Sequence, residues 1–355
     1  MREYYHKELN KLVSFVKPDI VWKNSICDMD DVQVELKRIR RLSKQKTRLL
    51  ITYYNQIWEP VLNFASFLGF RKKVGIQNWL DENDINNLCE LSNWEIITSQ
   101  KRFLFPPLIG WVVARPINYK QRNYSVSIII PARNEAGNIK KILKKIPKFG
   151  RSKEIIFVEG NSTDDTWEEI KKLKGVKCFK QKGKGKGDAV RLGFSKATGE
   201  ILMILDADMT VDPKELTKFY DAIITGKGEF INGCRLVYPM EKQAMQTLNR
   251  LGNMLFGWLF TWILGQRFKD TLCGTKVLFK EDYKNIVKNR KFFGNFDPFG
   301  DFDLIFGAIK LNLKVVEIPI RYKERTYGTT NISRFKHGLL LAKMTLIAFV
   351  KFKIW

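Results

Sequence analysis

Apolar and polar positions follow two kinds of pattern in residues 121–336. Short continuous apolar runs predict strands buried on both faces of a sheet, and apolar residues near a 3.6-residue period predict helices. The strand candidates are residues 126–130, 154–158 and 201–205. The helix candidates are residues 138–146, 166–173 and 189–197. Strands and helices that alternate at this spacing predict an α/β fold with a mostly parallel sheet and right-handed crossovers.

Residues 1–120 show similar patterns and predict a second, smaller α/β segment. Its strand candidates are residues 19–22, 48–52, 94–97 and 110–114. Its helix candidates are residues 31–42, 58–68 and 82–91. Pro106, Pro107 and Pro116 interrupt the pattern, so we place a domain boundary near residue 120. A third segment, 337–355, mixes apolar residues with lysines and predicts a basic amphipathic C-terminal helix.

The N-terminal segment resembles part of a known fold. Its runs DVQVELKRIRRLSKQKTRLLITYYN and WLDENDINNLCELSNWEII resemble the C-terminal half of a class I methyltransferase. Those enzymes bind S-adenosylmethionine on a Gly-rich turn after their first strand, and no such turn precedes Asp19. The resemblance therefore implies a partial, non-catalytic segment that serves as a remnant or as a docking surface.

Composition and charge narrow the classes of function. The 355 residues are 45% hydrophobic, which is enough for a substantial core and argues against intrinsic disorder. With 62 Lys and Arg against 37 Asp and Glu, the net charge of +25 favours an anionic partner. His6 and His337 are too few for a histidine-rich metal site, and the five cysteines form no CxxC pair. We expect a protein of the reducing cytoplasm without a signal peptide.

The residues that follow the predicted strands carry the candidate chemistry, because ligands of parallel α/β sheets bind at the carboxyl ends of the strands. The three strands lead into residues 131–135 (PARNE), residues 159–165 (EGNSTDD) and the pair Asp206 and Asp208. Carboxylates at positions i and i+2, where a strand runs into a loop, can face the same side. Such oxygens suit Mg²⁺ or Mn²⁺, which takes one or two protein carboxylates together with phosphate oxygens and water.

These motifs resemble the family-two glycosyltransferases of the GT-A fold, and most of all the dolichyl- or polyprenyl-phosphate sugar synthases such as the mannose synthases. Over residues 124–336 the matching segments, in family order, are SVSIIIPARNEAGNI, VEGNSTDDT, KGKGDAVRLGF, LDADMT, NGCR, TLCGTK and ERTYGTTN. The resemblance implies transfer, with inversion, of a hexose from a GDP- or UDP-linked sugar. Gly160 stands where the family has an acid that contacts the nucleobase, and Asn331 stands where it has a phosphate-binding lysine.

The resemblance also implies roles for single residues. Contacts to the nucleotide sugar are implied for Pro131, Arg133, Glu135, Glu159, Gly187, Asp188, Asp206, Ala207 and Asp208. Of these, Asp208 would bind the metal that bridges the donor diphosphate, and Asp206 would lie beside it and approach the ribose or sugar. Asp303, in GDFDLI, matches an acidic position near the acceptor. Asp206, Asp303 and Arg325 are therefore the residues that we expect to take part in catalysis.

The acceptor decides which further residues are needed. An alcohol would need a carboxylate base, whereas a lipid phosphate, with a second pKa of about 6, is already largely dianionic at pH 7. A lipid phosphate would need cations instead, and the candidates are Arg235, Lys276, Arg321 and Arg325. A soluble or cell-envelope glycan hydroxyl is the alternative acceptor, and a non-catalytic scaffold is the alternative function.

Two apolar segments bear on the choice between membrane and nucleic acid. Residues 251–266 are uncharged but cover only about 24 Å as a helix, and residues 338–355 carry Lys343, Lys351 and Lys353. Both predict helices that lie in the membrane interface or pack in the core, not helices that cross a bilayer. A polyprenyl acceptor favours helices that lie in the membrane interface. This placement predicts peripheral attachment to the inner face of the membrane. No RNP, zinc-finger or helix-turn-helix pattern supports a nucleic-acid partner.

Overall fold

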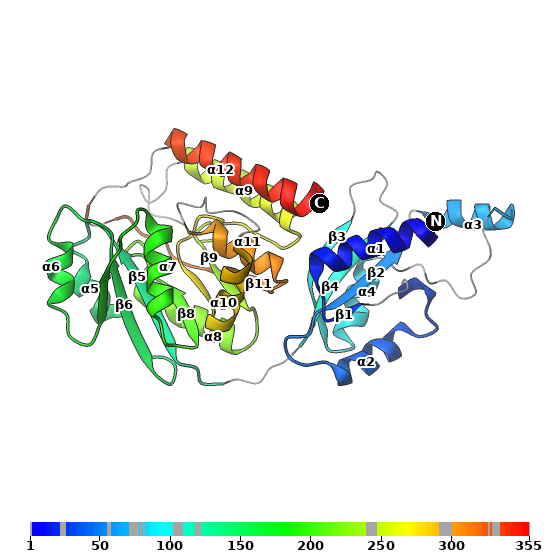
Figure 1. Ribbon diagram of the computed structural model, residues 1–355, viewed down its shortest axis with the longest axis horizontal. Coiled ribbons are helices and arrows are strands. Elements are labelled where there is room, and N and C mark those ends of the chain that lie inside the picture. Colours follow the sequence, from blue (N-terminus) through cyan, green and yellow to red (C-terminus); the bar gives the residue numbers. More distant parts are fainter. Residues whose placement is uncertain are drawn as a thin grey trace. The chain divides into compact units, whose positions relative to one another are not determined.

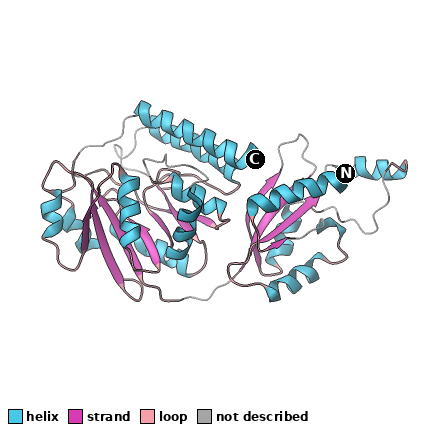
Figure 2. Ribbon diagram, in the orientation of Figure 1, coloured by secondary structure: helices cyan, strands magenta, loops and turns pink. Residues whose placement is uncertain are grey.

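The chain forms two compact units, Met1–Tyr119 and Lys120–Trp355 (Figure 1). Figure 2 shows that each unit combines a sheet with helices. The computed structural model describes residues 2–21, 26–54, 58–70, 78, 80, 82–101, 109–117, 122–238, 247–290, 300–325, 327–328 and 334–354.

The described part of the first unit contains a four-stranded sheet in the order β1-β2-β4-β3. β1 and β2 are parallel, and β4 is antiparallel to β2 and β3. Side chains alternate across the sheet, so that Leu49 and Ile51 share a core with α2 and α4, and Leu50 packs with α1 on the other face. The strands are β1 (Ile20–Val21), β2 (Leu49–Tyr54), β3 (Trp94–Lys101) and β4 (Ile109–Pro116). The helices are α1 (Arg2–Val16), η1 (Ile26–Asp28), α2 (Val32–Leu42), α3 (Glu59–Phe67) and α4 (Glu82–Glu90).

The second unit contains a seven-stranded sheet in the order β11-β9-β10-β8-β5-β6-β7. Of these strands, β10 alone runs antiparallel to its neighbours. The predicted α/β fold with a mostly parallel sheet is therefore confirmed. The strands are β5 (Val126–Ala132), β6 (Lys153–Glu159), β7 (Lys177–Lys180), β8 (Ile201–Ile204), β9 (Phe230–Cys234), β10 (Lys276–Phe279) and β11 (Val315–Pro319).

Helices cover both faces of this sheet. Ile128 and Ile130 of β5 belong to a core that also contains buried residues of α5, α6 and α8. Ile129, which points the other way, meets Gly193 of α7, where a side chain would collide with it. The helices are α5 (Ile139–Lys145), α6 (Thr166–Lys171), α7 (Lys186–Lys196), η3 (Pro213–Glu215), α8 (Leu216–Ile224), α9 (Thr247–Leu264), α10 (Lys280–Asn289), α11 (Phe302–Lys310), α12 (Arg334–Phe349) and the π-helical turn η5 (Val350–Ile354).

The two apolar segments singled out in the sequence form a pair of helices. α9 and α12 lie side by side (Figure 1), and Trp262 of α9 stacks on Phe349 of α12 with ring centroids 5.8 Å apart. None of the described helices combines the length and the hydropathy needed to span a bilayer.

Candidate active site

Three predicted loops meet at one edge of the second sheet. β8, β5 and β6 are neighbours and run parallel, so the loops that follow them leave the sheet on the same side. The loop after β5 contains Glu135, the loop after β6 begins beyond Glu159, and the loop after β8 contains Asp206 and Asp208. The amide of Gly160 donates to the carbonyl of Ala132 at 2.9 Å and links the first two loops at their bases. The edge is therefore a place where several acidic side chains converge.

Arg325 joins two of these loops. Its Nη1 donates to Oε1 of Glu135 at 2.7 Å, and its Nη2 donates to Oδ2 of Asp208 at 3.0 Å. Burial raises the pKa of Glu135, although the charge of Arg325 and a hydrogen bond from Asn138 act in the opposite direction. The guanidinium side chain is still 26% exposed, so it lies at the surface of the edge and not in the core. The motif RTYG thus brings a cation to the two carboxylates that the sequence predicts as donor contacts.

Asp206 is paired with a lysine that the sequence analysis did not select. Nζ of Lys186, in the first turn of α7, lies 2.5 Å from Oδ1 of Asp206. Burial alone would raise the pKa of Asp206, but the charges of Lys186, Lys276 and Arg235 lower it. Conversely, the pKa of Lys186 is raised against the effect of burial, mainly by Asp206 and Asp301. Both groups are therefore charged at neutral pH.

Lys276 and Asp301 form a buried ion pair next to this one. The ammonium of Lys276 is fully buried and lies 2.7 Å from Oδ1 of Asp301, and it also donates to the carbonyl of Cys273. Its charge contributes to the lowered pKa of Asp206, which shows that the two pairs interact. Asp301 precedes α11 and lies two residues before the predicted acid, Asp303. The structure thus brings Asp301, and not Asp303, into the ion network of the sheet edge.

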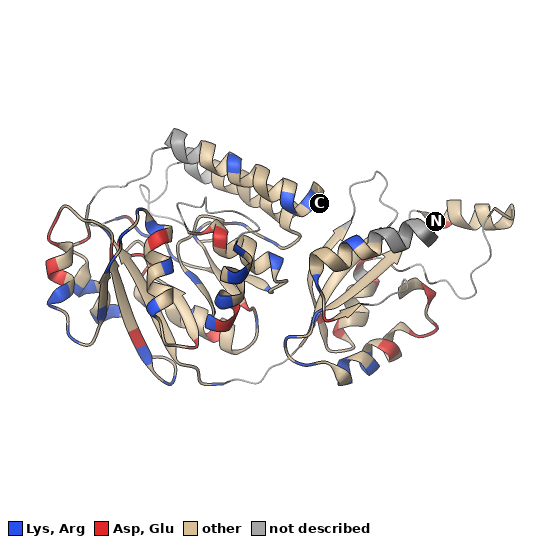
Figure 3. Ribbon diagram, in the orientation of Figure 1, with Lys and Arg blue, Asp and Glu red and all other residues tan. Residues whose placement is uncertain are grey.

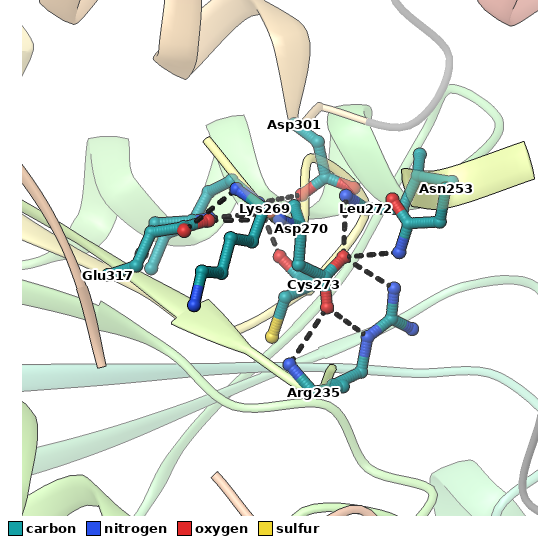
Figure 4. Close-up of polar contacts among 10 residues, drawn as sticks. Arg235, Asn253, Lys269, Asp270, Leu272, Cys273, Asp301 and Glu317 are labelled. Atoms are coloured by element: carbon teal, nitrogen blue, oxygen red, sulfur yellow. Dashed lines mark hydrogen bonds and ion pairs between the residues drawn. The ribbon is translucent and has the colours of Figure 1, made fainter. Parts of the chain in front are cut away.

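Arg235 is held by a buried carboxylate, as Figure 4 shows. Its Nε and Nη2 donate to the two oxygens of Asp270 at 2.7 and 2.8 Å, and its backbone amide donates to Oδ2 at 3.0 Å. The guanidinium also lies over the ring of Tyr322, 5.1 Å from its centroid. Arg235 is only 12% exposed, so it is a fixed cation beside the edge and not a freely moving surface charge.

Two glycines, Gly274 and Gly300, lie where the chain approaches the site so closely that no side chain fits. A Cβ on Gly274, in TLCGTK, would collide with the carboxylate of Asp206 and with Nζ of Lys186. A Cβ on Gly300, whose φ is +73°, would lie 2.6 Å from Cα of Gly187. Both positions therefore need a residue without a side chain, because the side chains of Asp206 and Lys186 approach Gly274 closely and the backbone of Gly187 approaches Gly300 closely.

The other predicted residues lie at or near the edge but make different contacts. Asp188 accepts a hydrogen bond from the amide of Gly183 at 3.1 Å, so it closes the Gly-rich turn before α7. Glu159 is buried and accepts from the amide of Ser162. Asp303 forms ion pairs with Arg290 at 2.9 Å and with Arg191 at 3.7 Å.

The remaining predicted positions are placed as follows. Pro131 is the last residue but one of β5, Arg133 is exposed just beyond that strand, and Ala207 is buried between the two aspartates. Gly187 lies in the first turn of α7. Arg321 is exposed and lies over the ring of Tyr238, 5.8 Å from its centroid. Asn331 lies outside the described residues.

The donor set fits a divalent cation that is shared with a phosphorylated ligand. Among the described residues, no group of three or more His, Cys, Asp or Glu side chains could hold a metal by itself. Mg²⁺ and Mn²⁺ do not need such a group, because one or two carboxylates suffice when phosphate oxygens and water complete the shell. Oδ1 of Asp208 accepts from the amide and the hydroxyl of Thr210, which orients the carboxylate.

Basic residues are distributed over both units and are not confined to one element (Figure 3). The net charge of +25 therefore does not locate the site by itself. At the edge, Lys186, Arg235, Lys276 and Arg325 each pair with an acidic side chain, and each cation is less than a third exposed. The phosphate groups of a ligand could bind the partly exposed cations, Lys186 and Arg325, in place of their acidic partners.

Residues 127–292 match the family model described as glycosyl transferase family 2. The matched segment, 166 of the 355 residues, lies within the second unit. The match confirms the predicted resemblance of this segment to the family-two glycosyltransferases. The matches do not test the resemblance of residues 1–120 to methyltransferases, which stays a prediction.

Several curated relatives are glycosyltransferases by name, among them dolichol- and dolichyl-phosphate sugar transferases. A glycosyltransferase, AglJ, from Haloferax volcanii is 29% identical over 216 residues, which are 60% of this chain and 68% of that protein. A dolichol-phosphate mannosyltransferase from Pyrococcus furiosus is 30% identical over 58% of this chain and 59% of its own length. A dolichyl-phosphate hexose transferase from Haloferax volcanii is 27% identical over 61% of this chain and 91% of its own length.

Solved structures resemble the chain more weakly. Glucosyl-3-phosphoglycerate synthase from Mycobacterium tuberculosis, in complex with Mn²⁺, UDP and glucosyl-3-phosphoglycerate, superposes with a TM-score of 0.48 at 16% identity. The superposition covers 64% of this chain and 80% of that one.

Proposed function

We propose that the glycosyltransferase domain moves a hexose from a nucleoside-diphosphate sugar, GDP- or UDP-linked, to a polyprenyl phosphate at a membrane surface. The observation that carries the proposal is the convergence of Asp206, Asp208, Lys186 and Arg325 at the carboxyl ends of β8 and β5. Relatives named as dolichyl-phosphate sugar transferases support the choice of acceptor. The family match supports the reaction class.

The donor half of the site follows from the charge that the reaction develops. An oxygen of the acceptor phosphate attacks the anomeric carbon, and the bond from that carbon to the donor diphosphate breaks with its electron pair on the diphosphate. A nucleoside diphosphate therefore leaves with an additional negative charge. Arg325 and Lys186 are fixed cations that would stabilise this charge in the transition state. When bound, Mg²⁺ or Mn²⁺ would neutralise further charge on the diphosphate, and Asp208 with Asp206 would hold it.

The acceptor half needs cations and no base. A phosphate monoester is largely dianionic at neutral pH, so no side chain has to remove a proton before attack. Arg235, fixed by Asp270, and the exposed Arg321 are the cations that we assign to the acceptor phosphate. Lys276 would act only through the field that it adds, because its ammonium is buried against Asp301. Asp303, which is paired with Arg290 and Arg191, would orient α11 and not take a proton.

The pair of α9 and α12 offers a surface for the lipid. The helices expose large apolar side chains at positions that recur on one face of each helix. On α9 and on α12 with η5 these residues are Met254, Leu255, Trp258, Trp262, Leu339, Leu346, Val350 and Ile354. Lys343, Lys351 and Lys353 supply positive charge to the same segment, and each basic residue near an anionic leaflet contributes about 1 kcal/mol. We therefore propose peripheral attachment to the inner face of the membrane, with residues 1–120 as a non-catalytic docking segment.

The attachment is tested by the double substitution Trp258→Ser and Leu346→Ser in the full chain. We expect the lipid concentration at which half of the protein sediments with anionic vesicles to rise at least about tenfold. Each large apolar side chain contributes about 1.5–3 kcal/mol when it is buried. The matched control is Val287→Ser, which removes an exposed apolar side chain from α10. Equal sedimentation of all three proteins would contradict the assignment of this surface.

The reaction is tested by incubation of the full chain with radiolabelled nucleotide hexoses, a polyprenyl phosphate in detergent, and Mn²⁺. We expect one donor to transfer its label into the organic phase, and we expect excess chelator to stop the transfer. Release of labelled free sugar only, or label on a glycan and none on the lipid, would contradict the polyprenyl-phosphate acceptor. Failure of every donor to bind would favour a non-catalytic scaffold.

A further inference from the structure

Arg235 owes its position to residues far from it in the sequence. Asp270, whose carboxylate is fully buried, receives both Nε and Nη2 of Arg235 and the backbone amide of the same residue. Planar two-point pairing of this kind fixes the orientation of a guanidinium as well as its location. Any residue that fixes Asp270 therefore also fixes the direction in which Arg235 points.

Asp270 is fixed from three elements. Its amide donates to Oε1 of Glu317 in β11 at 3.0 Å, and its carbonyl accepts from Nδ2 of Asn232 in β9 at 2.7 Å. Its carboxylate accepts from Nδ2 of Asn253 in α9 at 2.8 Å (Figure 4). Burial opposes its charge, but Arg235 and the hydrogen bonds lower the pKa of Asp270 to about 2. The carboxylate therefore remains charged at any pH near neutrality.

Asn253 is a polar residue on the buried face of a mostly apolar helix. It is 3% exposed, while its neighbours Met254 and Leu255 are more than half exposed on the opposite side. A buried amide costs free energy unless it is hydrogen-bonded, so a leucine would serve packing alone better. Among the described residues, its Nδ2 donates to the carboxylate of Asp270, and its Oδ1 has no hydrogen-bond partner. The residue type is therefore explained by the carboxylate that it contacts.

We propose that Asn253 and Asp270 are positioning residues, which hold the guanidinium of Arg235 in the orientation that binds the acceptor phosphate. The ligand rests on the function proposed above, whereas the positioning itself rests only on the contacts of the three side chains. One consequence is that α9 has two roles: its exposed face carries the apolar residues of the membrane surface, and its buried face orients a phosphate-binding cation.

The test uses the full chain with Asn253→Leu and, as a second variant of smaller volume, Asn253→Ala. The matched control is Thr261→Val, at another polar residue of α9. It removes the hydrogen bonds between the Thr261 hydroxyl and the backbone of Phe268 and leaves the contacts of Asp270 in place. We expect KM for a short-chain polyprenyl phosphate to rise about tenfold in both Asn253 variants, as expected for loss of a hydrogen bond to a charged group. KM for the nucleotide sugar should change less than about twofold, and the control should leave both values unchanged.

A second readout does not depend on activity. In protein labelled with ¹⁵N-arginine, the Nε–H signal of Arg235, assigned by its loss in Arg235→Lys, should be sharp and protected from exchange in the wild type and the control. It should broaden or exchange faster in the Asn253 variants. An unchanged signal would overturn the positioning role, whatever the kinetics. If the signal changes but the protein does not use polyprenyl phosphate, the positioning role is upheld and only the acceptor is contradicted. If both KM values change, the effect is a general structural one and the proposal is overturned.

Discussion

Replacement of Asp208 by alanine is expected to abolish sugar transfer while the protein stays folded. Asp208 lies in the loop after the buried strand β8. Its Oδ1 accepts from Thr210, and its Oδ2 accepts from Arg325. The substitution removes the carboxylate that we assign to the divalent cation and leaves Arg325 without one of its two partners. Loss of metal-assisted charge stabilisation is expected to reduce kcat/KM by about 10³-fold or more. The side chain is 16% exposed, so the core is not disturbed.

The measurement compares initial rates of transfer and thermal unfolding curves for the wild type and Asp208→Ala. The matched control is Asp221→Ala, which removes an exposed carboxylate from α8 in the same unit. We expect the control to keep both its rate and its unfolding temperature. Turnover of Asp208→Ala within about tenfold of the wild type would rule out the metal assignment, since that assignment requires several kcal/mol from this one group.

Replacement of Arg325 by alanine is expected to have the second largest effect, a loss of about 10²–10³ in kcat/KM. The guanidinium bridges Glu135 and Asp208 and is 26% exposed, so it can reach a ligand at the edge. Without it, two carboxylates face the diphosphate with no cation between them. The pKa of Glu135, which burial already raises, should rise further because Arg325 is the main group that lowers it. The acidic limb of the pH–rate profile should therefore move to higher pH.

Arg325→Lys separates charge from geometry in this prediction. A lysine keeps the charge but cannot bridge two carboxylates with a planar fork, so we expect an intermediate rate. The control is Arg151→Ala, which removes an arginine that is 64% exposed and paired with Glu200 on the surface. If Arg325→Ala retained the rate and the pH profile of this control, Arg325 would have no role in the transition state.

Local patterns were sufficient to predict the elements that place the site. Apart from Ser127 and Glu154, the runs 126–130, 154–158 and 201–205 are apolar, because the strands that they form are buried on both faces. Their parallel order then brings the three loops together without any knowledge of side-chain contacts. The structure differs at the boundaries: β5 continues to Ala132, and α7 begins at Lys186 and not at residue 189. The Gly-rich sequence around Gly185, whose φ is +85°, obscures that helix start.

The ion pairs of the site could not be predicted in the same way, because each joins residues that are distant in the sequence. Lys186 belongs to a run of lysines and glycines that is typical of a solvated loop, and its partner Asp206 lies 20 positions later. Arg235 and Lys276 look like surface charges until Asp270 and Asp301 are placed beside them. Asp301 and Asp303 are only two positions apart, but residues i and i+2 of a helical turn point in different directions. The family motif alone could not decide between them.

The claim on which the account depends is that a lipid phosphate, held by fixed cations, is the nucleophile. The most direct measurement compares a polyprenyl phosphate with the corresponding polyprenol as acceptor, with the same labelled donor, Mn²⁺ and full-length protein. We predict a labelled lipid with the phosphate and none with the alcohol, together with one nucleoside diphosphate released for each sugar transferred. Equal labelling of the alcohol would contradict the account, because the site would then have to supply a base that we do not assign.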